Sequence, residues 1–343
     1  MKALVLKQYN DLVYEDFPEP TIASDEVLVQ VKACGICGSD VHGIDGSTGR
    51  RIPPIIMGHE AAGVIADVGA NVSGWQRGDR VTFDISIYCG KCHFCRRGLL
   101  NLCDNRRILG VSTPEYRMHG AFAEYVAIPQ QVMYRLPEAL SFERAAMVEA
   151  VSVAAHAIER TPVSVNDTAL VVGAGVIGLL IIRLLRIAGC GQVFAVDLEP
   201  DRLEKARELG ADVCLTSGVD DVAAEVRRRT ANRGADIAIE AVGLTPTVQM
   251  AVASLRKGGS LTLVGNLAPT VELPLQDVVI RQLTLVGSTN STVEAEACLA
   301  MMASCLVDVD TLISAVAPLA DGASWFERLH KREPGLMKVI LVP

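Results

Sequence analysis

An α/β fold is predicted for this chain of 343 residues, with a doubly wound parallel sheet and a second lobe that is rich in short strands. The length suffices for two domains of roughly 100 to 200 residues each. Up to about residue 150, alternating segments such as EVLVQV, GVIADV and DRVTF are broken by glycine and proline, which is typical of strands and turns. From about Asp167, apolar strands alternate with amphipathic helices, as in a parallel sheet that is covered on both faces.

The elements of the second half follow a regular order. Strands ALVVG, VFAVD, ADIAIEAVG and SLTLVG are separated by helical segments, of which VIGLLIIRLLRIAG, DRLEKARELG and Val248–Leu255 are the clearest. After about Gly287, we expect a helix over Val293–Met302 and a final apolar strand over Lys338–Val342.

Composition and charge restrict the partners of the chain. Half of the residues are hydrophobic, and a net charge of −8 with a pI near 5.4 argues against a nucleic-acid surface and against binding to anionic membrane. The segment MKALVLKQYN lacks the charged-then-apolar order of a signal peptide, and Arg183 and Arg186 interrupt the apolar run around Gly178–Ile187. We therefore expect a cytoplasmic protein that acts on a small molecule.

Four cysteines, Cys89, Cys92, Cys95 and Cys103, have the spacing C-x2-C-x2-C-x7-C, which can close one loop around a metal ion. Four thiolates fill the tetrahedral shell of zinc and leave no position for water or substrate, so the pattern predicts a structural zinc. A disulfide with two spare thiols and an iron–sulfur cluster are the alternatives. Bacterial cluster signatures are more tightly spaced and end in proline, whereas Asp104 follows here, and an intracellular chain favours metal over disulfides.

The segment VVGAGVIG has the pattern G-x-G-x-x-G directly after a strand and at the start of a helix. Gly173 permits a tight turn, Gly175 lets the backbone approach a pyrophosphate, and Gly178 permits close packing of helix on strand. The helix begins at Val176 and Ile177, where free amides can bind the phosphates.

Asp197 ends the next strand, at the distance where an acid accepts the ribose hydroxyls of a dinucleotide. Its charge would repel a ribose phosphate, so NAD is favoured over NADP. Arg202 lies nearby and is expected to pack against adenine or solvent. The alternative is that Asp197 caps the helix that begins at Pro200.

Cys37, His59 and Glu60 suggest a second metal site, because one thiolate, one imidazole and one carboxylate meet the need of an open zinc site for three protein ligands. Neither the segment that contains Cys37 nor the one that contains His59 and Glu60 is specific for a metal site by itself. Cys34 and Cys37 could form a redox pair, and a lone histidine is more often a hydrogen-bonded core residue than a ligand.

The segments GICGSD, GHEAAGVI, the four-cysteine lobe, GAFAEY and GAGVIG resemble, in this order, the zinc-dependent medium-chain dehydrogenases along essentially the whole chain. The segment MVEAVSVAAH is similar to the pattern of sorbitol and other polyol dehydrogenases, with Ala150 where those usually have proline. The resemblance implies a GroES-like catalytic domain over residues 1–152 and 287–343, with a zinc lobe at about 86–106. A Rossmann domain over 153–286 would be inserted in it.

The resemblance also implies roles for single residues. Cys37, His59 and Glu60 would hold the catalytic zinc, with Glu149 as a fourth ligand or as the partner of a zinc-bound water. The zinc would lower the pKa of a secondary alcohol, whose hydride passes to NAD to give a ketose. The hydroxyl of Ser39 would accept the alcohol proton, and His42 would be the next group of the relay. Asp40 would be the carboxylate that orients His59. The segments on the nicotinamide side of the cofactor would include Ala241, Val242, Val264, Gly265, Asn266, Ser288 and Thr289.

The substrate is less strongly indicated. Sorbitol-type enzymes usually have a tyrosine where this chain has Gly43, and an Arg-Tyr pair where it has Ser288–Ser291. We therefore expect a roomier pocket with neutral polar contacts, which suits an unphosphorylated alditol first, a sugar-alcohol phosphate of the galactitol 1-phosphate type second, and threonine third. A phosphate or a carboxylate would need a cation, for which the candidates are Arg50, Arg51, Arg117 and Lys338.

An insertion at Val111–His119, which includes Glu115 and Arg117, either contributes to specificity or forms a surface loop. The non-enzymatic alternative is an NAD-binding regulator with a decayed zinc site, and a zinc-independent quinone reductase is a further one. The resemblance implies a homo-oligomer, a dimer or a tetramer, in which Leu261–Val264 and Leu283–Val286 could extend a sheet across a dimer axis.

Overall fold

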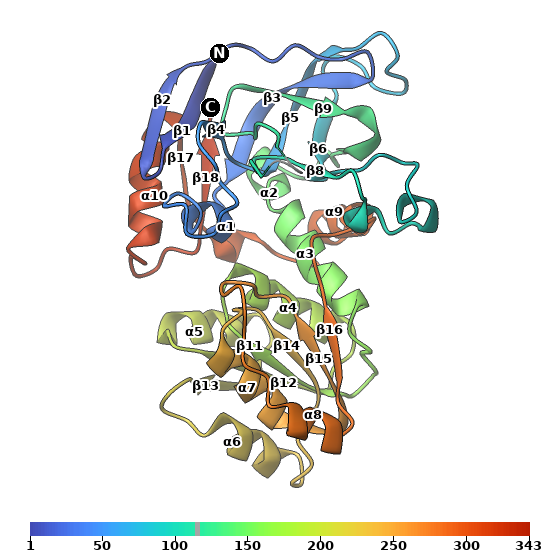
Figure 1. Ribbon diagram of the computed structural model, residues 1–343, viewed down its shortest axis with the longest axis vertical. Coiled ribbons are helices and arrows are strands. Elements are labelled where there is room, and N and C mark those ends of the chain that lie inside the picture. The colour runs from blue at the N-terminus through green and yellow to red at the C-terminus, as the bar shows by residue number, and fades with distance from the viewer. Residues whose placement is uncertain (114–116) are drawn as a thin grey trace. The chain divides into compact units, whose positions relative to one another are not determined.

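The computed structural model describes residues 1–113 and 117–343 (Figure 1). The chain forms two compact units, one from residues 1–149 and 291–343 and the other from residues 150–290. The domain ends expected from the sequence were 152 and 287, close to these limits. The α/β fold class is confirmed, with the parallel sheet confined to the second unit.

The first unit is built from three sheets of short strands. The longest strand, β3 (Glu26–Gly35), alternates buried and partly exposed residues over Val29–Ala33, which places one face of this part on the core, and is buried on both faces towards its ends. The three-stranded sheet has the order β2 (Asp11–Asp16), β1 (Lys2–Gln8), β4 (Ile55–Ile56). The seven-stranded sheet has the order β10 (Met133–Arg135), β6 (Arg80–Phe83), β5 (Glu60–Val68), β3 (Glu26–Gly35), β18 (Lys338–Val342), β17 (Ile313–Pro318), and β9 (Tyr125–Pro129) pairs with β3. The remaining pair is β7 (Ser86–Ile87) with β8 (Arg107–Ile108).

Pairing across this sheet places the C-terminal strand beside the strand Glu26–Gly35. The last strand β18 lies antiparallel to β3, with Ile340 opposite Gly35 and Leu341 opposite Cys34. On its other side β3 pairs with β5, so that Gly35 also lies opposite Glu60. The metal-ligand segments predicted near Cys37 and His59 therefore begin where three strands meet.

Few helices belong to the first unit. They are α1 (Gly38–Val41), α2 (Phe142–Ala145), α9 (Ala295–Ala303) and α10 (Gly322–His330), and α10 lies beside β2 (Figure 1). Helix α3 (Val148–Glu159) begins at the boundary between the units. Single 3-10 turns complete the unit: η1 (Cys95–Arg97), η2 (Leu100–Leu102), η3 (Gln130–Val132), η4 (Asp310–Leu312) and η5 (Leu319–Asp321).

The second unit is a six-stranded parallel sheet with the order β13 (Val213–Thr216), β12 (Gln192–Asp197), β11 (Thr168–Val172), β14 (Ala235–Glu240), β15 (Leu255–Leu263), β16 (Thr284–Gly287). Its helices are α4 (Val176–Ile187), α5 (Pro200–Glu208), α6 (Val222–Arg229), α7 (Thr245–Ser254) and α8 (Leu275–Ile280). The strand order reverses between β11 and β14, and ligands of such sheets bind at the carboxyl ends of the strands at this point. Among the described residues, no helix has the length and apolar character needed to span a membrane.

Candidate active site and metal centres

The four cysteines of the lobe converge. The sulfur atoms of Cys89, Cys92, Cys95 and Cys103 all lie within 4.8 Å of one another, and all four thiols are free. The Sγ of Cys92 lies 3.5 Å from that of Cys95 and 3.9 Å from that of Cys103. Four sulfurs at about 2.3 Å from one zinc in a tetrahedron would be separated by about 3.8 Å, whereas a disulfide needs about 2.05 Å. The geometry fits a single tetrathiolate ion.

Backbone amides surround these sulfurs. The amide of Cys89 donates to the Sγ of Cys103 (3.2 Å), as does the amide of Asn105 (3.3 Å). Backbone hydrogen bonds lower the pKa of Cys89 to about 6, while burial raises the pKa of Cys95 to about 12. Such a set of thiols becomes fully ionised only when a cation is bound, which is the behaviour of a structural metal site.

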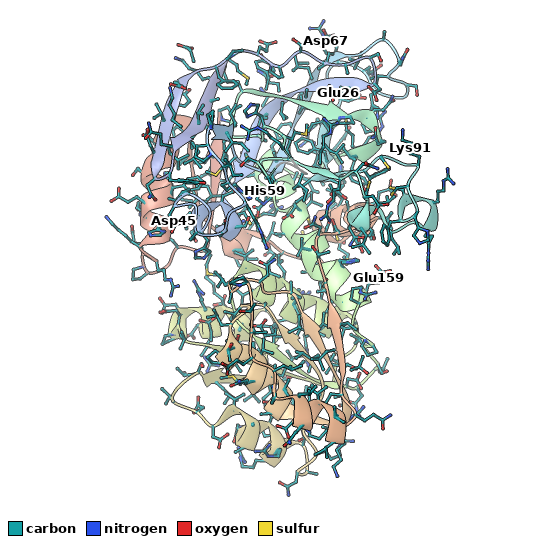
Figure 2. The ribbon with its side chains drawn as sticks, viewed as in Figure 1. Glu26, Asp45, His59, Asp67, Lys91 and Glu159 are labelled. Atoms are coloured by element: carbon teal, nitrogen blue, oxygen red, sulfur yellow. The ribbon has the colours of Figure 1, made fainter. Side chains whose placement is uncertain are left out.

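A second cluster contains Cys37, His59 and Glu60, whose ligand atoms also lie within 4.8 Å of one another. Cys37 precedes α1, while His59 and Glu60 stand at the start of β5; His59 is labelled in Figure 2. Three donors leave a fourth tetrahedral position open, which is the arrangement of a catalytic zinc. Cys34, the other half of the possible redox pair, is buried and free, outside this cluster.

The charges at this cluster indicate that a cation belongs there. Burial raises the pKa of Cys37 to about 11, and the charge of Glu60 adds to the rise. Burial also raises the pKa of Glu149 to about 8, although His59 opposes the rise. A divalent cation would favour the ionised form of both groups. Glu149 is close enough to interact with the cluster but does not join the three-residue set among the described residues.

Glu60 already has one cationic partner. The buried Nζ of Lys338 donates to Oε1 (2.7 Å) and Oε2 (2.5 Å) of Glu60, and to the carbonyl of Ile36 (3.1 Å). Burial by itself would lower the pKa of Lys338, but the charges of Glu60, Cys37 and Glu149 and the hydrogen bond to Glu60 together outweigh it, so the pKa is raised and Lys338 is charged. A Cβ at Gly35 would lie 2.3 Å from Oε2 of Glu60, so the glycine makes room for this pair.

Asp40 is fully buried and faces His59. Its Oδ2 lies 3.4 Å from Nδ1 of His59, which leaves the other ring nitrogen, Nε2, as the metal-ligand atom. Its Oδ1 accepts hydrogen bonds from Nε (3.0 Å) and Nη2 (2.7 Å) of Arg51, and the same Nη2 donates to the Oγ of Ser39 (3.3 Å). The expected orienting role of Asp40 is thus supported by a guanidinium that the sequence had suggested only as a binder of phosphate.

The expectation of a roomier pocket at Gly43 is wrong, because Arg51 fills the space. A Cβ built on Gly43 would lie 2.5 Å from Cγ of Arg51 and 3.0 Å from the carbonyl oxygen of Ser39. The missing tyrosine therefore does not create an open volume here. Its place is taken by the aliphatic part of a buried arginine.

The proposed relay groups lie beside the cluster. Ser39 hydrogen-bonds to Cys37, which partly offsets the raised pKa of that thiol. Partial burial and the positive charges of Arg332 and His330 lower the pKa of His42, so its ring is neutral at pH 7 and able to accept a proton.

The glycine-rich segment has the geometry that its sequence pattern predicts. Gly173 has φ +97°, and a Cβ on Gly178 would lie 1.8 Å from the carbonyl oxygen of Gly173. Gly175 precedes α4, and a Cβ there would meet no described atom within 4 Å. The first amides of α4, those of Val176 and Ile177, are therefore open to an anion.

Asp197 ends β12 beside this turn. Its Oδ2 accepts from the amide of Ala174 (2.7 Å), and its Oδ1 accepts from the amides of Leu198 (2.8 Å) and Glu199 (3.0 Å). Arg202 lies 3.8 Å from Oδ2. Asp197 is not the helix cap, since the residue before α5 is Glu199, and a carboxylate has further lone pairs for ribose hydroxyls.

The neighbouring strand ends are held together by Glu240, which the sequence did not single out. This fully buried carboxylate accepts from the amides of Val242 (2.9 Å) and Gly243 (2.8 Å), and its carbonyl accepts from those of Val264 (2.9 Å) and Gly265 (3.0 Å). The segments that include Ala241, Asn266, Ser288 and Thr289 lie at the same carboxyl edge.

The structure therefore places the predicted residues in two groups within the first unit and one in the second. Glu115 of the insertion lies outside the described residues, while Arg117 is exposed and donates to the carbonyl of Pro54 (3.0 Å). The roles of Arg51, Lys338 and Glu240 were missed. Arg51 and Lys338 each depend on a contact with a carboxylate that no local motif reveals, whereas Glu240 acts through hydrogen bonds with backbone amides.

The chain matches two known protein families and curated relatives. Residues 23–138 match the family described as alcohol dehydrogenase GroES-like domain, and residues 176–304 match zinc-binding dehydrogenase. The sorbitol dehydrogenase of Bacillus subtilis is 35% identical over 348 residues, covering 100% of this chain and 97% of that protein.

Two solved structures are similar along the whole chain. The alcohol dehydrogenase TADH from Thermus sp. ATN1 has a TM-score of 0.93 at 31% identity, covering 100% of this chain and 99% of the other. The galactitol-1-phosphate dehydrogenase of Escherichia coli has a TM-score of 0.92 at 27% identity, covering 100% of both chains.

Proposed function

The chain belongs to the zinc-dependent medium-chain alcohol dehydrogenases, and from this membership we propose that it oxidises a secondary alcohol of a polyol to a ketose, with NAD as the hydride acceptor. The observation that carries the proposal is the convergence of Cys37, His59 and Glu60 on one point beside the hydroxyl of Ser39. A decayed regulator would not need to keep this set, and a quinone reductase without zinc would need neither metal cluster.

Each group of residues has a separate role in the proposed reaction. When bound to Cys37, His59 and Glu60, zinc supplies a Lewis acid that makes an alcohol proton more acidic. Ser39 is placed to accept this proton, and the neutral ring of His42 can pass it towards solvent. Glu149 adds negative charge at the same point, either as a ligand or through a water molecule. In the second unit, the amides at the start of α4 hold the pyrophosphate and Asp197 holds the adenosine ribose.

A neutral polyol suits the charges of this site better than a phosphate does. Of the four candidate cations, Arg51 and Lys338 are buried and paired with Asp40 and Glu60, so neither is free to bind a substrate anion. A buried phosphate without a cation is costly. The names of relatives include sorbitol dehydrogenase and D-xylulose reductase, which support a neutral polyol, and also D-arabitol-phosphate dehydrogenase. The galactitol-1-phosphate dehydrogenase neighbour keeps the phosphorylated substrate as the second candidate.

We expect free alditols such as sorbitol and xylitol to be oxidised faster than their phosphates, with kcat/KM at least tenfold higher, about 1.4 kcal/mol. The measurement is NAD reduction at 340 nm with alditols, alditol phosphates, diols and threonine at matched concentrations. Turnover of galactitol 1-phosphate together with inactivity on every free alditol would overturn the substrate class while leaving the zinc and NAD sites in place.

The cofactor preference is expected to follow Asp197. NAD should be preferred over NADP by at least tenfold in kcat/KM, roughly 1.4 kcal/mol, because the carboxylate accepts ribose hydroxyls and repels a phosphate. Asp197→Ala should reduce the ratio of kcat/KM for NAD to kcat/KM for NADP, mainly by raising the KM for NAD. The same substitution also removes hydrogen bonds from the amides of Ala174, Leu198 and Glu199, so it is compared with Asp197→Asn, which removes the charge but keeps the size of the side chain and one of its two accepting oxygens. A wild-type protein that uses NADP equally well would contradict the assignment.

The proposal includes a homo-oligomer that works in the cytoplasm. Strand β16 is an edge strand of the parallel sheet, and the adjacent helix α8 exposes Leu275, Val279 and Ile280 at 64%, 67% and 77%. An apolar edge of this kind is typical of an interface with a second copy. Two thiolate-containing metal sites favour a reducing compartment.

A further inference from the structure

Arg51 is a buried cation that the proposed chemistry does not use directly. It is 2% exposed, and its guanidinium makes two contacts to Oδ1 of Asp40 and one to the Oγ of Ser39. Asp40 touches the metal ligand His59, and Ser39 is the proposed proton acceptor. One side chain therefore connects both parts of the catalytic centre.

The chain is arranged to bring Arg51 there. The amide of Ser112 donates to the carbonyl of Arg50 (3.2 Å), and the amide of Ile52 donates to the Oγ of Ser112, so the backbone on both sides of Arg51 is fixed. The side chain then passes through the space where Gly43 lacks a Cβ. Any larger residue at position 43 would displace the Cγ of Arg51.

The contacts of Arg51 fix the orientation of the Asp40 carboxylate and of the Ser39 hydroxyl. Arg51 binds only Oδ1 of Asp40, so the plane of the carboxylate is fixed with Oδ2 towards Nδ1 of His59. Because Arg51 donates to the Oγ of Ser39, the proton of that hydroxyl points away from the guanidinium and is free for the hydrogen bond with Cys37. Without Arg51, Asp40 would be a buried charge free to rotate.

We propose that Arg51 is a positioning residue of the catalytic centre, which enters through the space left by Gly43 and fixes the orientation of Asp40 and Ser39 for zinc ligation by His59 and for proton transfer. This inference rests on the proposed function. On this view, Gly43 replaces the sorbitol-type tyrosine because it leaves room for Arg51 at the catalytic centre. It does not enlarge the substrate pocket.

The test compares Arg51→Ala, Arg51→Lys and Gly43→Ala with Arg50→Ala, a matched control whose side chain is exposed. Loss of an outer partner of a metal ligand typically costs about 10- to 100-fold in metal affinity or activity. We expect zinc release from the catalytic site to a chromogenic chelator to be about tenfold faster in Arg51→Ala. The kcat should fall about tenfold in Arg51→Ala, with the KM for the alcohol changed less than threefold. Arg51→Lys keeps the charge and serves if Arg51→Ala does not fold. The phase of release that is missing in Cys37→Ser identifies the catalytic zinc.

Spectroscopy of the cobalt-substituted protein supplies a readout that does not depend on turnover. Arg51→Ala and Gly43→Ala should shift the visible cobalt bands in the same direction, and Gly43→Ala should add little in the Arg51→Ala background, because both remove the same contact. Arg50→Ala should match the wild type. If Arg51→Ala and Arg51→Lys only lower the melting temperature and leave the cobalt bands, zinc release and kcat unchanged, the positioning role is refuted. A wild-type protein without catalytic zinc would instead refute the proposed function.

Discussion

Cys37→Ser should lower kcat with the best alditol at least about a thousandfold while the fold stays intact. Lewis-acid polarisation by zinc is worth several kcal/mol, and each 1.36 kcal/mol is a factor of ten in rate. Cys37 supplies the only thiolate of the open site, and a serine hydroxyl is a much weaker ligand for zinc. The measurement is steady-state NAD reduction together with circular dichroism and thermal unfolding.

The control for this prediction is Cys34→Ser, a buried free thiol three residues earlier that lies outside the ligand set. It should lose stability through its buried hydroxyl but keep a zinc-dependent rate. A Cys37→Ser protein that turns over within tenfold of the wild type would show that the cluster at His59 is not the catalytic metal site.

Cys95→Ser should destabilise the protein while leaving the catalytic zinc in place. The tetrathiolate ion closes the loop from Cys89 to Cys103, and a crosslink across a short loop is worth about 2–4 kcal/mol. For a protein of this size, that corresponds to a melting temperature lower by roughly 3–6 °C. The lobe should also become susceptible to limited proteolysis between residues 86 and 106.

Chelation gives an independent check on the same site. A strong chelator should reproduce the proteolysis of the lobe in the wild type and have no further effect on the lobe of Cys95→Ser. If Cys95→Ser lost only activity and kept its stability, while Cys37→Ser lost its folded structure, the assignment of the structural and catalytic sites would be reversed.

The features that could be predicted from the sequence are those encoded by local motifs. The four cysteines lie within one short segment, and the glycine pattern spans six residues, so their spacing alone restricts the geometry. The alternation of strands and helices likewise predicted the parallel sheet correctly, although α7 begins at Thr245 and β15 at Leu255, each earlier than expected.

Contacts between distant carboxylates and cations could not be predicted in this way. Lys338 and Glu60 are 278 residues apart, and their pairing depends on β18 lying next to β3. Arg51 is only 11 residues from Asp40, but its burial depends on the space at Gly43. Both arginine and lysine are usually exposed, so the sequence suggested these two residues only as candidate cations for an anionic substrate. The fold instead uses them to neutralise buried carboxylates.

Metal analysis of the purified protein shows directly whether one chain holds two zinc ions of different kinds. We expect about two zinc ions per chain in the wild type, one in Cys37→Ser and one in Cys95→Ser, in agreement with the two clusters. Dialysis against a mild chelator should remove the ion bound at Cys37 first and abolish NAD reduction, and added zinc should restore the rate. A wild-type protein that oxidises alditols with one zinc ion or none would contradict the assignment of one structural and one catalytic zinc ion to each chain.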